Sequence, residues 1–112
     1  MRQENHLSEI QKIEHIPYDG ILSQAKTIVA KDRLDVQRAD LIVAGFLGAT
    51  QISLGTAIEL GWADAMGKTT LIIMEPEGNP HDRFFLTEMA DFRVATVREA
   101  AEVAAAILLP GV

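Results

Sequence analysis

The chain has 112 residues, of which 48% are hydrophobic and 23% are charged, and its formal net charge is −6. This composition is typical of a globular protein, and we expect a single domain over residues 1–112 with a poorly defined segment at residues 1–20. The negative charge argues against binding to nucleic acid polymers, which need a basic surface, but not against a small anionic ligand.

The sequence contains no cysteine, which excludes a disulfide framework and a thiolate metal site. His81 has no partner histidine or cysteine at ligand spacing, and we expect neither a metal nor another cofactor. No apolar run approaches the roughly 18 residues of a membrane span, and the N-terminus lacks the apolar core of a signal peptide. We expect a cytoplasmic protein without membrane contact.

The first part of the chain gives a mixed pattern. Residues 9–16 fit either a short helix or a strand, and residues 17–20 predict a turn. Apolar spacing predicts a helix over residues 21–39. The apolar run at 41–46 is typical of a buried parallel strand.

The second part alternates between helices and strands. A helix is predicted from about Thr56 to Gly67, with Ile58, Trp62 and Met66 on its apolar face and Ala63 beside them. A second buried strand at 69–74 completes a strand–helix–strand unit, which should form a right-handed crossover in a parallel sheet. The remaining pattern predicts a loop, a short helix, a third strand and an alanine-rich helix, at residues 75–82, 84–90, 92–96 and 97–109.

The segment from Ser53 to Glu59 lies where the first buried strand gives way to a helix. In open α/β sheets ligands bind at this junction, and the helix amino end attracts anions. Glycine at position 55 would let a ligand approach the backbone. The same residues also fit a capping box, with Thr56 as the N-cap and Glu59 reaching back to it, and this alternative requires no catalysis.

Several pieces together resemble the nucleoside 2-deoxyribosyltransferase superfamily, most closely its short, often phage-encoded members. The pieces cover about residues 26–109 and are Asp32-Arg33, Ala39 to Ala44, Ser53 to Ala63, Gly67-Lys68, Gly78 to Asp82 and Phe92 to Val94. The resemblance implies a flavodoxin-like (Rossmann-like) three-layer α/β sandwich with a parallel sheet. It also implies an enzyme that acts at an N-glycosidic bond.

The resemblance implies roles for two acids. Glu59 matches the family's nucleophile, which attacks the anomeric carbon of a 2-deoxyribosyl group and leaves a covalent glycosyl-enzyme. This parallels retaining glycoside hydrolysis. A helix amino end would favour the ionised carboxylate that a nucleophile requires. Asp32 matches the family's other acid, which holds the base or manages its proton.

The resemblance also implies a binding role for Ser53, with Gly55 and Thr56 beside it. Relatives that hydrolyse 2′-deoxynucleoside 5′-monophosphates carry a serine at this position, whereas transferases of free nucleosides usually carry an aspartate. A hydroxyl can donate to phosphate, and an aspartate would repel it. Family members often complete the site across a dimer interface, so we expect a homodimer or higher homo-oligomer in which Asn79 and His81 contribute to the partner's site.

The sequence departs from the family's pattern at its start, where we find no glycine-containing loop after a first strand. Without that strand, the strand at 41–46 would expose an edge. The chain could be an incomplete copy, residues 9–16 could supply a strand, or an oligomer could cover the gap.

We therefore expect cleavage or transfer at the N-glycosidic bond of 2′-deoxynucleoside 5′-monophosphates. The alternatives are a non-catalytic nucleotide-binding or interaction protein, and deoxyribosyl transfer between free nucleosides. The fragment Gly55-Thr56-x-x-Glu59 is also similar to cytokinin-activating nucleotide phosphoribohydrolases, but their preceding Pro-Gly-Gly is absent here.

Overall fold

The computed structural model describes residues 24–111. The chain divides into two compact units, residues 1–32 and 33–112, which we describe separately. Helix α2 (Ala25–Arg38) crosses this division and lies within the helix predicted at 21–39. The predictions for residues 9–16 and 17–20 lie outside the described residues, and the single-domain prediction stays a prediction.

The unit of residues 33–112 contains a parallel three-stranded sheet. Its strands are β1 (Ile42–Gly45), β2 (Thr70–Ile73) and β3 (Phe92–Val94), in the order β1-β2-β3. Ile42 pairs with Thr70, and Leu71 pairs with Phe92. All three strands were predicted. The parallel pairing of β1 and β2, with a helix between them in the chain, confirms the strand–helix–strand unit, and its right-handedness stays a prediction. Within residues 24–111, β1 has a neighbour on one side only.

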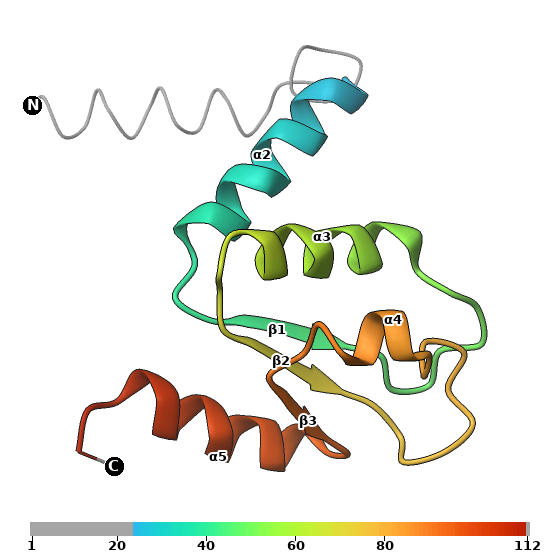
Figure 1. Ribbon diagram of the computed structural model, residues 1–112, viewed down its shortest axis with the longest axis vertical. Coiled ribbons are helices and arrows are strands. Elements are labelled where there is room, and N and C mark those ends of the chain that lie inside the picture. Colours follow the sequence, from blue (N-terminus) through green and yellow to red (C-terminus); the bar gives the residue numbers. More distant parts are fainter. Residues whose placement is uncertain (1–23, 112) are drawn as a thin grey trace, which may run out of the picture. The chain divides into compact units, whose positions relative to one another are not determined.

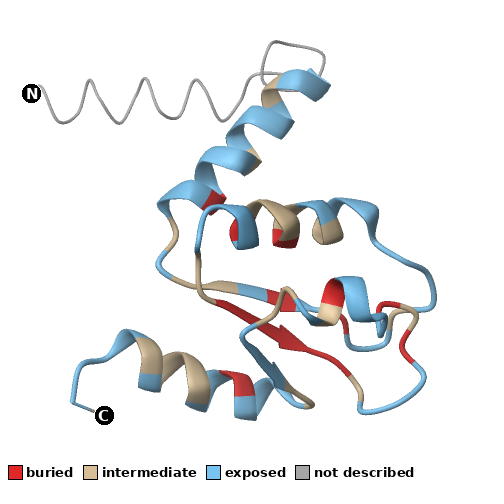
Figure 2. Ribbon diagram, viewed as in Figure 1, coloured by how far each residue is buried: buried red, intermediate tan, exposed pale blue. Residues whose placement is uncertain are grey.

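Helices cover both faces of this sheet. Helices α3 (Leu54–Ala65) and α4 (Phe84–Thr87) lie on one face, and α5 (Val97–Leu108) lies on the other (Figure 1). Side chains of a strand alternate between faces, and β2 is buried along its whole length (Figure 2). Ile72 packs in the cluster with α3 and α4, while Leu71 and Ile73 pack with Ala100 of α5. The result is the predicted α/β architecture of three layers.

The prediction for the buried face of α3 is confirmed for Ala63 and wrong for Ile58 and Met66. Leu60 and Ala63 are fully buried at 0% exposure, whereas Ile58 is 44% and Met66 is 37% exposed. Trp62 is only partly buried. Alanine brings the helix close to the sheet because it adds little volume. Apolar residues on both sides of α3 made the periodicity ambiguous about which side faces inward.

The end of α3 follows the prediction that Gly67 is the residue after the C-cap. Gly67 has a φ of 69°, and its N–H donates to Asp64 O at 3.1 Å. The Lys68 N–H donates to Ala63 O at 2.8 Å. This pair of bonds is a Schellman motif, and glycine is favoured there because φ is positive.

Thr70 offers a test of the packing at the start of β2. Its buried hydroxyl donates to Met89 O at 3.0 Å and accepts from the Asp91 N–H at 3.1 Å. We expect Thr70→Val to lower the free energy of unfolding by about 1–3 kcal/mol, because the Met89 carbonyl loses a donor in a partly buried bond. The matched control Thr87→Val removes an exposed bond to Arg83 O, and should cost less than about 0.5 kcal/mol. Equal losses in urea unfolding would contradict this account.

Candidate active site

Helix α3 begins one turn earlier than predicted. Ser53 is its N-cap, with φ −87° and ψ 103°, and its hydroxyl accepts from the Thr56 N–H at 3.4 Å. The Ala57 N–H donates to Ser53 O at 3.1 Å, which is the first intrahelical bond. The prediction that Thr56 is the N-cap is therefore wrong. A capping box from Thr56 to Glu59 does not form, because Glu59 lies in the second turn.

The start of α3 places Glu59 close to the residues predicted to bind substrate. Glu59 is partly buried and lies three residues after Thr56 and four after Gly55, so the three share one helix face. Helical side chains lean toward the N-terminus, so we expect the Glu59 side chain to lie over the turn that contains Gly55. A Cβ built on Gly55 would meet nothing within 4 Å, so the surface at Gly55 is open.

The first turn of α3 leaves hydrogen-bond donors for a ligand. The Ser53 N–H donates to His81 Nε2 at 2.7 Å, and the Thr56 N–H is taken by the Ser53 hydroxyl. Among residues 24–111, the N–H groups of Leu54 and Gly55 have no hydrogen-bond partner. The Ser53 and Thr56 hydroxyl oxygens lie 2.9 Å apart, and one proton serves that bond while the other stays available. Two N–H groups, a hydroxyl and the helix dipole favour an anion here.

A network of side chains, which includes the buried residues Asn79 and His81, contacts this turn. Asn79 Oδ1 accepts from the His81 N–H at 2.9 Å and lies 3.0 Å from His81 Nδ1. Asn79 Nδ2 donates to Phe46 O at 2.7 Å and to Glu75 Oε1 at 2.8 Å. Glu75 Oε2 accepts from the Gly48 N–H at 2.8 Å. The network joins the loop after β2 to the loop after β1.

The partners of this network fix the proton on His81. A backbone N–H can only donate, so the bond from Ser53 requires an unprotonated Nε2. The remaining proton is on Nδ1 and donates to Asn79 Oδ1. The imidazole is therefore neutral, in its Nδ1–H tautomer. Within the described part of the chain every buried polar side-chain atom has a partner.

A second set of contacts holds the loop after β2. Arg93 donates to both carboxylate oxygens of Asp82, at 2.9 and 3.0 Å, and also to Glu75 O at 2.9 Å. The hydrogen bonds from Arg93 lower the pKa of Asp82. The pKa of Glu75 is lowered mainly by the Gly48 N–H and then by Asn79. Both carboxylates are thus stabilised in the ionised form by the contacts that order the loop.

The structure brings four of the predicted site residues together at the start of α3, namely Ser53, Gly55, Thr56 and Glu59. Asn79 and His81 are buried within their own chain at 7% and 2% exposure, and contact Ser53 and Phe46 from inside. Their contribution to a partner's site stays a prediction. Asp32 is partly buried in α2, in the other unit, so its role also stays a prediction.

Sequence reasoning missed Glu75 and the link from His81 to Ser53. The available signal was the position of residues 75–82 directly after β2, because neighbouring parallel strands bring their following loops together. Over residues 24–111, no group of three metal-ligating acids or histidines occurs. In the same residues, no helix has both the length and the apolar character to cross a membrane.

Glu75 gives a pH prediction. The pKa of Glu75 is lower in the folded chain than its ordinary value of 4.5. The ionised side chain therefore contributes its full stabilisation above pH 4.5, and this stabilisation is lost as the pH falls through the lower pKa of the folded chain. We expect Glu75→Gln to flatten the pH dependence of the unfolding midpoint below about pH 4.5. The control Glu77→Gln alters an exposed neighbour in the same loop and should leave the slope unchanged. If the unfolding midpoints of wild type and Glu75→Gln changed with pH by the same slope, this role of Glu75 would be contradicted.

Comparisons with known proteins address the fold and the family. The family model described as nucleoside 2-deoxyribosyltransferase matches residues 5–104. This match begins well before residue 26, where the resemblance seen in the sequence starts. No curated protein matches the chain.

Among solved structures, the chain is similar to the CMP N-glycosidase BcmB of Clostridium botulinum. The two are 21% identical with a TM-score of 0.53, and the match covers 74% of this chain and 69% of that chain. At this identity the similarity concerns the fold, and it confirms the flavodoxin-like α/β prediction. With the family model matching most of its length, the chain belongs to the nucleoside 2-deoxyribosyltransferase family.

Proposed function

We propose that this chain cleaves or transfers at the N-glycosidic bond of 2′-deoxynucleoside 5′-monophosphates, with Glu59 as the nucleophile. Family membership supports chemistry at an N-glycosidic bond. The observation that carries the rest is the start of α3, where Ser53 rather than Thr56 is the N-cap. This start leaves donors for a phosphate about one helical turn before the carboxylate of Glu59.

The phosphate is assigned to the first turn of α3. The N–H groups of Leu54 and Gly55 and one hydroxyl of the Ser53–Thr56 pair would donate to its oxygens. Hydrogen bonds to a charged acceptor are stronger than neutral ones, and the helix dipole adds to them. Glu59 follows at roughly one helical turn, about 5.4 Å along the axis, so the sugar would lie between phosphate and carboxylate.

The reaction proposed for Glu59 proceeds in two steps. A carboxylate oxygen of Glu59 forms a bond to C1′ while the bond from C1′ to the base breaks, and the electron pair leaves with the base. The base takes up a proton, which Asp32 would supply or manage. Water, or a second base, then attacks C1′ and releases Glu59, with retention of configuration. The negative carboxylate stabilises the positive charge that develops on the sugar.

The solved relative is named a CMP N-glycosidase, and its substrate is therefore a ribonucleotide. A nucleoside monophosphate is also the substrate class proposed here, but the sugar differs. A substrate panel for this chain should thus contain deoxynucleotides, ribonucleotides and free nucleosides.

A non-catalytic nucleotide-binding protein is the second candidate. It is favoured by the position of β1, which within residues 24–111 lies at the edge of the sheet. A homodimer would suit either candidate, because Leu54 and Ile52 beside the first turn of α3 are 70% and 51% exposed. A second copy that covered them would also exclude water from the site.

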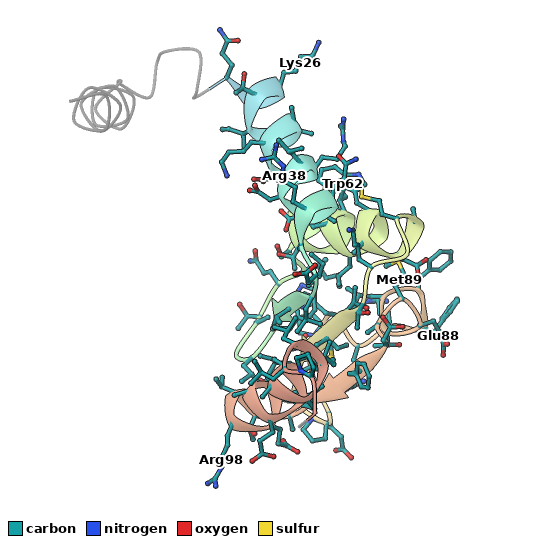
Figure 3. The ribbon with its side chains drawn as sticks, turned by 90° about the vertical axis from the view of Figure 1, so that its left-hand side faces the viewer. Lys26, Arg38, Trp62, Glu88, Met89 and Arg98 are labelled. Carbon is teal, nitrogen blue, oxygen red and sulfur yellow. The ribbon has the colours of Figure 1, made fainter. Side chains whose placement is uncertain are left out.

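Glu59→Gln tests the catalytic proposal. The substitution keeps the shape and removes the nucleophilic charge, so we expect base release to fall by at least about 10³-fold with the fold retained. The measurement is chromatography of the free base released from each member of the panel. The control Glu102→Gln removes the same charge from α5, where its neighbour Arg98 points into solvent (Figure 3). Turnover that survives in Glu59→Gln would contradict the nucleophile assignment.

Ser53→Asp tests the phosphate assignment. Aspartate caps helices as well as serine does, so the fold should persist, but its charge would repel a phosphate. We expect KM for the monophosphates to rise by at least about tenfold, which corresponds to 1.4 kcal/mol, with little change for free nucleosides. The control is the thermal unfolding midpoint, which should stay near that of the wild type. An equal loss for nucleotides and nucleosides would contradict a phosphate at Ser53.

A further inference from the structure

We propose that His81 is a positioning residue that sets the first turn of α3 for the ligand's phosphate. It does so by accepting the Ser53 N–H, which leaves the N–H groups of Leu54 and Gly55 as the donors that face the ligand. This inference rests on the proposed function, because it assumes a phosphate at Ser53. It assigns to His81 a role within its own subunit.

The His81 ring is fixed on three sides. Its Nε2 accepts from Ser53 at 2.7 Å, and its Nδ1 lies 3.0 Å from Asn79 Oδ1. Its face lies against the Phe46 ring, with centroids 4.2 Å apart and planes at 33°. Phe46 is itself 3% exposed in the core cluster. A ring held in this way presents a lone pair at a constant position.

The network constrains the loop after β1 at three backbone points. Asn79 binds Phe46 O, Glu75 binds the Gly48 N–H, and His81 binds the Ser53 N–H. These points lie at the start, near the start and at the end of the loop that leads into α3. A loop held before the ligand arrives loses less conformational freedom on binding, which raises affinity. The network therefore preorganises the phosphate site without touching the ligand.

The two amide substitutions of His81 separate its two hydrogen bonds. The amide of glutamine reaches about as far as Nε2, and that of asparagine about as far as Nδ1. His81→Gln can therefore still accept from Ser53, whereas His81→Asn keeps only the contact with Asn79. If His81 had only a structural role, His81→Asn and His81→Gln would weaken the binding of nucleotides and of nucleosides by equal amounts.

The experiment measures binding in the Glu59→Gln background, so that it does not depend on turnover. The probes are dAMP, dGMP, dCMP and TMP, each beside its nucleoside, and inorganic phosphate. For the monophosphates we expect Kd to rise by about tenfold in His81→Asn, as one lost hydrogen bond implies, and by less than about threefold in His81→Gln. Kd for the nucleosides should change by less than about threefold in both variants.

A measurement without ligand accompanies it. Nitrogen-15 NMR of the wild-type imidazole should show the neutral Nδ1–H tautomer of His81. An Nε2–H tautomer would overturn the inference whatever the ligand does. So would equal affinity changes for nucleotides and nucleosides, unchanged monophosphate affinity in His81→Asn, or monophosphates that bind no better than their nucleosides. Binding that follows the expected pattern without base release in the wild-type chain would instead contradict the proposed reaction.

Discussion

The hydrogen bond from the Ser53 N–H to His81 Nε2 is the interaction on which the candidate site depends. It joins the N-cap of α3 to the loop that follows β2, and thereby unites two crossover loops at the carboxyl edge of the sheet. Behind it, Asn79 and Glu75 extend the chain of hydrogen bonds to the loop after β1. In the function proposed above, this ordered edge sets the position of the donors at the start of α3 relative to the carboxylate of Glu59.

The sequence predicted the architecture well and the local faces less well. Alternation of apolar runs with helical spacing was sufficient to predict β1, β2 and the helix between them, because long-range pairing follows from burial. It was only partly right for the inward side of α3, where Ala63 is buried as expected but Leu60 packs instead of Ile58 and Met66. Periodicity shows only where the apolar residues of a helix lie. When they lie on both sides, the contacts with neighbouring elements decide which side is buried.

The candidate site, like the fold, could be predicted from the sequence only in part. Ser53, Gly55, Thr56 and Glu59 could be predicted because they are close in sequence and match a family pattern. The support from His81 could not, since it depends on a hydrogen bond across 28 residues. The cap is the instructive case. Both Ser53 and Thr56 are good N-caps, and local sequence did not reveal that the helix starts at the earlier one.

The central claim is a covalent bond between Glu59 and the sugar. Its most direct test starts from the wild-type chain mixed with a deoxynucleotide that it turns over. The reaction is quenched rapidly, and the peptides of the chain are analysed by mass spectrometry. The account predicts a peptide containing Glu59 that is heavier by one 2-deoxyribosyl 5-phosphate group, and no such adduct in Glu59→Gln. An adduct on another carboxylate, or base release with no adduct and inversion at the anomeric carbon, would contradict it.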